Sequence, residues 1–136
     1  MSSAITISSL ATAYGKTQVL HDINITIPKG IVFGLIGLNG AGKTTLIKVL
    51  LGLREATAGQ ALVLGYRPGH AEAKKQIAYL PEKFEPPAFL TGFEFIDFTQ
   101  NIYGRKVTHE AISQAADLLQ LQHAALPRRV TSYSKG

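Results

Sequence analysis

The stretch from Gly37 to Thr44, with the sequence GLNGAGKT, constrains this chain more than any other. It matches G-x-x-x-x-G-K-[ST], the phosphate-binding P-loop or Walker A motif, at every fixed position. Four residues between the two fixed glycines let the backbone wrap a phosphate with its N–H groups pointing inward. Lys43 can reach β- and γ-phosphates as a compact charge, and the Thr44 hydroxyl can ligate Mg²⁺. The motif therefore predicts a phosphate-binding loop at the start of a helix.

The segments on either side of this motif have the order that a P-loop needs, with a strand before it and a helix after it. Residues Ile31–Ile36 are a continuous apolar run, which predicts a strand buried on both faces, as in a parallel sheet. Residues Thr45–Leu51 carry apolar side chains at helical spacing, and Gly52 can end that helix. A glycine-rich turn that binds nothing is the alternative, and this context argues against it.

The rest of the first 80 residues predicts short strands separated by turns, and the remainder of the chain predicts helices. We expect strands at residues 4–10, 19–27, 61–64 and 77–80, a loop with Tyr14 at residues 11–16, and a short helix at residues 71–76. Thr91 and Glu94 form the pattern of a capping box that opens a helix ending near Gly104. A second helix is expected from Thr108, with its apolar face made of Ile112, Ala115, Leu118 and Leu119.

The composition excludes several classes of protein. The net charge is +5, but the basic residues are scattered and do not alternate with aromatic residues, so we expect no nucleic-acid partner. The chain has no cysteine, and its four histidines are unclustered, so neither a disulfide framework nor a His/Cys metal site is expected. No apolar run approaches the roughly 18 residues of a membrane span. Any work at a membrane is therefore expected to proceed through a partner.

Three stretches, taken together, resemble one family, the ATPase domains of ATP-binding-cassette (ABC) proteins. The opening of such a domain resembles residues 12–65, TAYGKTQVLHDINITIPKGIVFGLIGLNGAGKTTLIKVLLGLREATAGQALVLG. The family's glutamine loop resembles residues 77–82, IAYLPE, and the start of its signature motif resembles residues 130–136, VTSYSKG. The three stretches occur in the family's order, and the interval from Lys43 to Ser134 suits a transporter ATPase. The resemblance covers essentially the whole chain.

The resemblance implies an α/β fold: a P-loop NTPase core of the ABC type, an antiparallel β subdomain and the start of a helical subdomain. We expect the nucleotide-binding core at residues 1–83 and the helical part, ending in the signature motif, at residues 84–136. The sequence contains no Walker B strand with its Asp and catalytic Glu, and no D-loop or switch histidine. We therefore expect an incomplete domain, the N-terminal part of a cassette.

The resemblance also assigns roles to individual residues. Tyr14 matches the aromatic residue that stacks on adenine; the alternative is a partly buried surface tyrosine. Glu82 stands where the family most often has glutamine, a tentative catalytic residue and ligand for Mg²⁺ and the attacking water; the alternative is a solvated loop acid. Ser134 and Gly136 match signature residues that contact the γ-phosphate on the opposite protomer, and Lys135 replaces a usual glycine. The residues that match the phosphate cradle are Gly37, Leu38, Asn39, Gly40, Ala41, Gly42, Lys43, Thr44 and Thr45.

The function implied by the resemblance is that of the ATP-binding subunit of an ABC transporter, with ATP and Mg²⁺ as cofactors. Such a subunit is cytoplasmic, attaches to the membrane through a permease partner, and pairs head to tail with a second cassette. The YLPE and SKG variants resemble cassettes of the export type. A chain without Walker B is expected to be inactive alone. The alternatives are a soluble ABC-type nucleotide switch, such as a translation or repair factor, and an inactive nucleotide-binding fragment.

Overall fold

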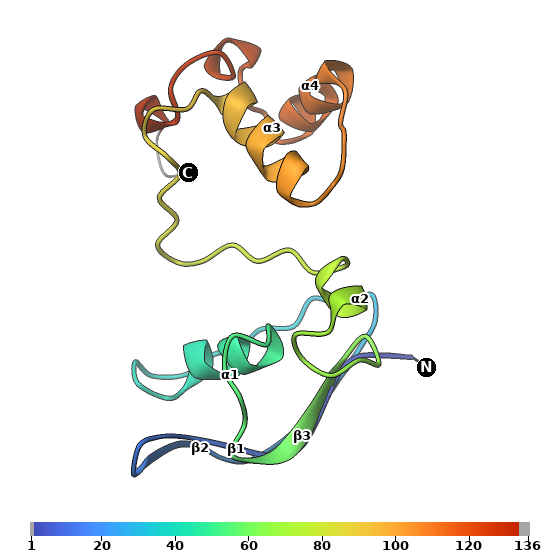
Figure 1. Cartoon of the computed structure of the whole chain (residues 1–136), viewed down its shortest axis with the longest axis vertical. Coiled ribbons are helices and arrows are strands. Elements are labelled where there is room, and N and C mark those ends of the chain that lie inside the picture. The colour runs from blue at the N-terminus through green and yellow to red at the C-terminus, as the bar shows by residue number, and fades with distance from the viewer. Residues whose placement is uncertain (1, 134–136) are drawn as a thin grey trace. The chain divides into compact units, whose positions relative to one another are not determined.

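The computed structural model describes residues 2–133. The chain forms two compact units, a first that extends to Ala78 and a second that begins at Tyr79, and each is described by itself (Figure 1). The first unit contains β1 (Ser3–Tyr14), β2 (Thr17–Pro28), α1 (Lys43–Leu50), β3 (Ala58–Val63) and α2 (Ala71–Lys74). The second contains α3 (Gly92–Ile102), α4 (His109–Leu118) and the 3₁₀ turns η1 (His123–Ala125) and η2 (Val130–Ser132).

The strands of the first unit form an antiparallel sheet in the order β2-β1-β3. This confirms the antiparallel β subdomain and the strands expected at residues 4–10, 19–27 and 61–64. The loop expected at residues 11–16 is wrong, because β1 continues to Tyr14, which pairs with Thr17 at the start of β2. Two residues, Gly15 and Lys16, are enough to reverse the chain, since Gly15 adopts a φ of +59° that glycine tolerates without strain.

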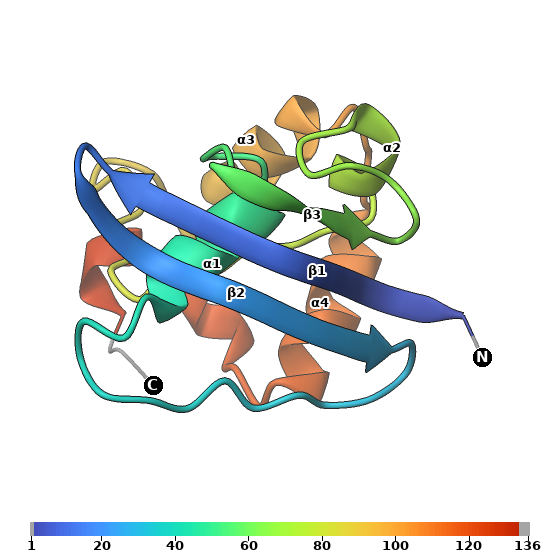
Figure 2. The same cartoon turned by 90° about the horizontal axis from the view of Figure 1, so that it is seen from below.

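Helix α1 covers one face of this sheet, as Figure 2 shows. Its residues Leu46 and Val49 are buried, which confirms the apolar face predicted for this helix. The helix ends as predicted at Gly52, whose φ is +71°. The buried core of the unit joins α1 to all three strands and consists of Ile7, Leu10, Leu20, Leu46, Val49 and Ala61.

The buried strand expected at Ile31–Ile36 is not present. Residues 31–38 adopt no strand, and Val32 and Ile36 have relative exposures of 101% and 95%. A strand of a parallel sheet is buried only when neighbouring strands accept its hydrogen bonds and helices cover both faces. Among the described residues, no strand pairs with this segment. The strand expected at residues 77–80 is absent for the same reason, and Tyr79 and Leu80 are exposed.

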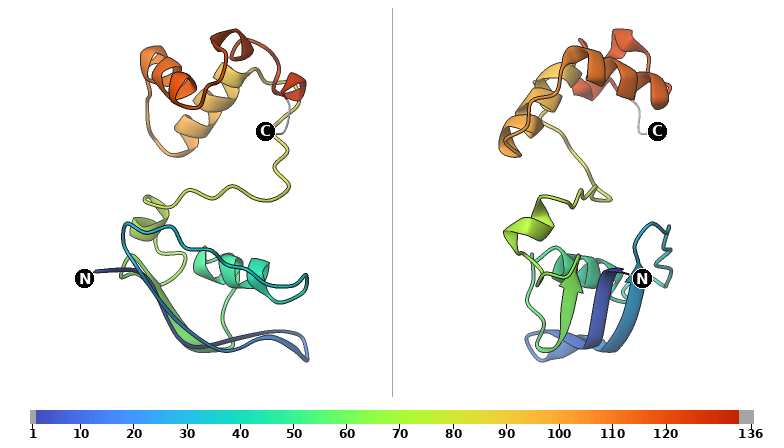
Figure 3. Two further views of the ribbon diagram at one scale, coloured as in Figure 1. Left: turned by 180° about the vertical axis from the view of Figure 1, so that it is seen from behind. Right: turned by 90° about the vertical axis from the view of Figure 1, so that its right-hand side faces the viewer.

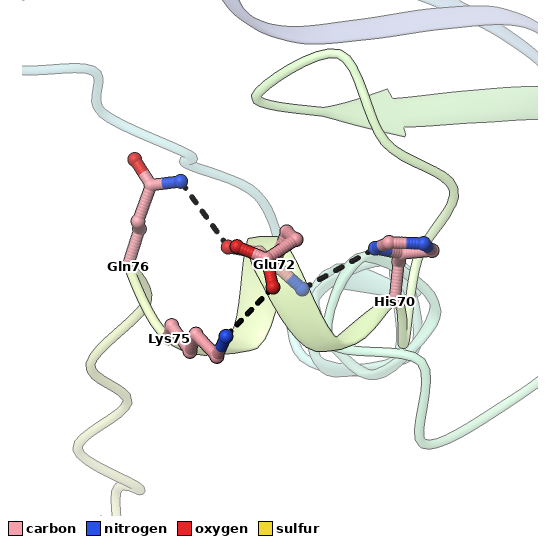
Figure 4. Close-up of polar contacts among 4 residues, drawn as sticks. All are labelled: His70, Glu72, Lys75 and Gln76. Atoms are coloured by element: carbon pink, nitrogen blue, oxygen red, sulfur yellow. Dashed lines mark hydrogen bonds and ion pairs between the residues drawn. The ribbon is translucent and has the colours of Figure 1, made fainter.

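Helix α2 is a single turn held by local polar contacts (Figure 4). The ring of His70 accepts a hydrogen bond from the backbone N–H of Glu72, at 3.2 Å, and stacks on Tyr66. The carboxylate of Glu72 pairs with Lys75 at 2.7 Å, and the carbonyl of Glu72 accepts a hydrogen bond from the Gln76 side chain. These short-range contacts confirm the helix predicted in this region, although it is two residues shorter than expected.

In the second unit, α3 begins with the predicted capping box. The hydroxyl of Thr91 accepts a hydrogen bond from the backbone N–H of Glu94, and the Glu94 carboxylate accepts one from the backbone N–H of Thr91 at 2.7 Å. Helix α3 then packs against α4 (Figure 3). The core of this unit consists of Ile112, Ala116 and Leu126, with Phe93 and Ile96 packed against it.

The apolar face predicted for α4 is only partly correct. Ile112 is buried as expected, but the next buried residue is Ala116, one turn further along the same line of the helix. Ala115 and Leu118 lie on the flank of that line, and Leu119 follows the last helical residue. Leu118 and Leu119 have relative exposures of 86% and 78%. The face of α4 that packs against the core is therefore narrower than the apolar face that its sequence periodicity predicted.

Candidate functional site

The P-loop approaches the β1–β2 hairpin closely at Gly42. Gly42 adopts a φ of +86°, and a Cβ there would lie 2.7 Å from a methyl carbon of Leu20 and 3.2 Å from the carbonyl oxygen of Val19. Only a residue without a side chain lets the loop approach β2 this closely. Gly40 also has a positive φ, of +84°, but a Cβ there would meet no described atom within 4 Å. The loop is thus anchored at Gly42 and open at Gly40.

The side chain of Lys43 folds back across the loop. Its ammonium group donates hydrogen bonds to the carbonyl oxygens of Gly37 and Leu38, at 2.7 and 2.8 Å. The loop is tightened by a further bond from the backbone N–H of Ala41 to the same Leu38 carbonyl, at 3.2 Å. A cation bonded to neutral carbonyls in an exposed loop is ready to exchange them for anionic oxygens, since hydrogen bonds between charged partners are the stronger ones.

The first turn of α1 is an open donor site. Its N-cap residue is Gly42, no side chain of the described residues caps this turn, and the turn carries no acidic residue. The first backbone N–H groups of a helix have no partner within the helix, and its dipole places partial positive charge there. These donors and the Lys43 ammonium group fit a phosphate.

The donor set also fits Mg²⁺ held jointly with phosphate. The Thr44 side chain is exposed beside the open turn, whereas Thr45 is buried at 8% exposure. Residues 2–133 contain no cluster of three or more His, Cys, Asp or Glu side chains that could hold a metal ion. Mg²⁺ characteristically binds through few protein ligands, substrate phosphates and retained waters. A single exposed hydroxyl at a phosphate site matches that pattern, so Thr44 is the residue that would hold the ion.

Tyr14 is brought to the first turn of α1 by the fold. Its side chain makes a hydrogen bond with the side chain of Thr45, which lowers the pKa of the phenol, and the charges of Arg54 and Lys48 lower this pKa further. Arg54 lies over the ring, with its Cζ 3.5 Å from the ring centroid. Tyr14 as a whole residue has a relative exposure of 47%. An exposed aromatic ring next to a phosphate-binding turn is what the adenine-stacking role requires, and that role stays a prediction.

Glu82 lies in the second unit and is exposed, in a segment at residues 79–90 without helix or strand. It lines a largely apolar hollow of about 810 Å³ within that unit, together with Phe84, Phe95 and Tyr133. Glu85 is the other acidic residue among those that line it, and two carboxylates fall short of a three-residue metal-binding cluster, of which the described part of the chain has none. The expected roles of Glu82 toward Mg²⁺ and the attacking water therefore remain predictions.

The approach to the signature motif is fixed up to Tyr133. The Tyr133 hydroxyl donates a hydrogen bond to the carbonyl of Ala125 at 2.7 Å, and a Cβ on Gly92 would lie 2.2 Å from this hydroxyl. The backbone N–H of Val130 donates to Leu90 at 2.9 Å. These contacts were not predicted from the sequence, although a glycine at the first helical position is a weak signal of close approach. The motif positions themselves lie outside the described residues, namely Ser134, Lys135 and Gly136.

Comparisons with known proteins identify the family of the chain. The family model for ABC transporters matches residues 20–136. An uncharacterized ABC transporter ATP-binding protein of Synechocystis sp. is 38% identical over 124 residues, which cover 89% of this chain and 35% of that protein. The linearmycin resistance ATP-binding protein LnrL of Bacillus subtilis is 37% identical over 115 residues, which cover 82% of this chain and 36% of that protein.

The fold is also found in solved structures. The structure of an ATP-binding subunit of an ABC transporter superposes with a TM-score of 0.81 at 29% identity, over 97% of this chain and 56% of that chain. The chain thus spans about a third of the length of the two relatives and about half of the solved subunit. Because the family model matches most of the sequence and the same fold recurs at this similarity, the chain belongs to the ABC transporter family, in the ATP-binding domain.

Proposed function

We propose that this chain is part of the ATP-binding subunit of an ABC transporter, which binds and hydrolyses ATP to drive transport through a membrane partner. The observation that carries the proposal is the arrangement around α1. The Lys43 ammonium group, the open first turn and the exposed ring of Tyr14 occur together in one unit.

In the proposed binding mode, Lys43 exchanges its bonds with the Gly37 and Leu38 carbonyls for bonds with β- and γ-phosphate oxygens. The N–H groups of the first turn of α1 bind the same phosphates, and Thr44 supplies a hydroxyl to Mg²⁺. Tyr14 stacks on the base. Mg²⁺ held by Thr44 would supply positive charge against the charge that develops during phosphoryl transfer.

The partners follow from the family. We propose a permease subunit, which Glu82 helps to couple to the nucleotide site, and a second cassette, to whose nucleotide Ser134 and Gly136 contribute in trans. In the described part of the chain, no helix has the length and apolarity to cross a membrane. This fits a cytoplasmic subunit that reaches the membrane through its permease. Transport is proposed to be export, supported by the YLPE and SKG variants and by a relative named for linearmycin resistance.

The test of nucleotide binding is Lys43→Ala, with Lys29→Ala as a matched control, since Lys29 is an exposed lysine of the same unit outside the loop. Hydrogen bonds to charged groups contribute about 1.5–3 kcal/mol, so Lys43→Ala is expected to weaken ATP binding by about 10- to 100-fold. Lys29→Ala is expected to bind as the parent does. Titration with fluorescent ATP in the presence of Mg²⁺ measures both. Unchanged affinity in a folded Lys43→Ala variant would contradict the proposal.

The transporter assignment is tested separately from binding. A neighbouring reading frame that encodes a polytopic membrane protein, and co-purification of that protein with the full-length subunit, are expected for a transporter. A full-length protein that carries a second cassette or a nucleic-acid-binding extension, and that binds no membrane protein, would favour a soluble nucleotide switch instead.

A further inference from the structure

We propose that Arg54 is a positioning residue for the nucleotide base: it covers one face of Tyr14 and fixes the ring so that the opposite face can stack. The inference rests on the proposed ATP-binding function and extends it to a residue outside the P-loop and the other family motifs. The ligand chemistry is that of a purine nucleoside triphosphate.

The guanidinium of Arg54 is held in place by two contacts. Its Cζ lies 3.5 Å from the centroid of the Tyr14 ring, well within the range of a cation–π interaction. One terminal nitrogen of the same group donates a hydrogen bond to the carbonyl of Ala13, the residue that precedes Tyr14. Arg54 follows α1 in the chain, whereas Ala13 lies in β1, 41 positions earlier. The arginine therefore ties the connection after the P-loop helix to the strand that carries the tyrosine.

The ring of Tyr14 is fixed at a second point by α1 itself. The side chain of Thr45, which directly follows the P-loop and is buried, interacts with the Tyr14 hydroxyl and lowers the pKa of the phenol. Arg54 thus fixes one face of the ring, and Thr45 fixes its tip. Tyr14 nevertheless has a relative exposure of 47% over the whole residue, so it still presents surface to solvent. A planar ring covered on one face offers its other face to a planar partner.

This arrangement favours base binding in two ways. A ring already fixed before the ligand arrives loses less conformational freedom on binding, and an immobilised side chain otherwise reduces affinity by about three- to tenfold. A cation on one face also draws the π electrons of the ring toward it, which favours an electron-rich purine on the other face. Both effects act at the base, because within residues 2–133 the recorded contacts of the Arg54 guanidinium are with the Ala13 carbonyl and the Tyr14 ring.

A purely structural role for Arg54, tying α1 to β1, would disturb phosphate and base binding alike. The experiment therefore compares ATP with inorganic tripolyphosphate, which has the phosphates without the base. Two variants are used: Arg54→Met keeps an apolar stem, and Arg54→Gln keeps a donor for the Ala13 carbonyl. In both, ATP affinity is expected to fall about three- to tenfold while tripolyphosphate affinity is unchanged. Arg67→Met, an exposed arginine of the same unit, is the control and is expected to bind both ligands as the parent does.

A double-mutant cycle with Tyr14→Ala completes the test. Without the ring there is nothing to position, so Arg54→Met is expected to have no further effect on ATP affinity in that background. The inference is overturned if either folded Arg54 variant keeps the parent's ATP affinity, if ATP and tripolyphosphate weaken equally, or if the two substitutions are additive. If the parent binds both ligands and the Arg54 variants bind them equally well, this inference is wrong and the proposed function still stands. A parent chain that binds neither ligand removes the proposed function, and this inference with it.

Discussion

Substitution of Gly42 tests whether the P-loop is packed against the hairpin as the structure shows. Gly42→Ala is expected to destabilise the first unit for two separate reasons. The left-handed φ of +86° is unfavourable for alanine by about 1–2 kcal/mol. The new Cβ would also lie 2.7 Å from the buried Leu20 side chain, and overpacking of this kind costs typically about 1–3 kcal/mol. The sum is about 2–5 kcal/mol, measurable against a typical domain stability of about 5–15 kcal/mol.

Gly40→Ala is the matched control, because Gly40 has nearly the same φ, +84°, and open space where a Cβ would point. It is expected to lose only the conformational contribution of about 1–2 kcal/mol. The difference between the two variants therefore isolates the contact with Leu20. Hydrogen exchange of the β1 and β2 backbone amides, measured without nucleotide, reports the opening free energy of this unit.

A third variant separates the clash from other effects of residue 42. Leu20→Val removes the methyl carbon that the new Cβ would meet, so the combination of Leu20→Val with Gly42→Ala is expected to be less destabilising than the sum of the two changes. A Gly42→Ala protein as stable as the Gly40→Ala protein would refute the packing of the loop on β2. Strict additivity with Leu20→Val would refute the assignment of the clash to Leu20.

Three further predictions concern the base, a helix cap and turnover. Tyr14→Ala is expected to weaken ATP and GTP by a similar factor, with Tyr14→Phe close to the parent in titrations with both nucleotides; equal binding by Tyr14→Ala would disprove stacking. The hydrogen bonds from the backbone N–H and the hydroxyl of Thr91 lower the pKa of Glu94, so their contribution is fully present above the unfolded pKa of about 4.3 and is lost as the pH falls through the lower folded pKa. After correction for the intrinsic pH dependence of exchange, the protection of the α3 amides is expected to fall across that acidic range in the parent and not in Glu94→Gln, and identical pH profiles would contradict the cap. The 136-residue polypeptide, whose sequence lacks the Walker B carboxylates, is expected to release phosphate from ATP only at background rates; steady release that Lys43→Ala abolishes would show that a catalytic carboxylate lies within it.

The features that the sequence predicted correctly are encoded within a few neighbouring residues. The P-loop motif, the helix that follows it and the stop at Gly52 depend on backbone freedom and spacing over about fifteen positions. The alternation of residues 19–27 predicted β2, and the pair Thr91 and Glu94 predicted the start of α3 down to its hydrogen bonds. The physical cause of each of these features lies within the segment itself, so each could be predicted without the rest of the chain.

The errors arise where a segment depends on distant partners. The apolar run Ile31–Ile36 has the composition of a buried strand, but burial and pairing are supplied by neighbouring strands, and none of the described residues provides one. Helix α4 shows the same dependence on a smaller scale. Its periodicity allowed a wide apolar face, and the packing against α3 and Leu126 selected the narrower line of Ile112 and Ala116.

The sequence by itself determined that this chain carries the P-loop motif and belongs to a recognisable family, because the residues of the motif are adjacent in the chain. Only the tertiary structure placed Arg54 on the ring of Tyr14 and Thr45 at its tip, and packed Gly42 on β2. These contacts join segments up to 41 positions apart. They exist because burial of the shared apolar core brings α1 onto the hairpin. Local periodicity and motif spacing do not predict which polar side chains come into contact as a result.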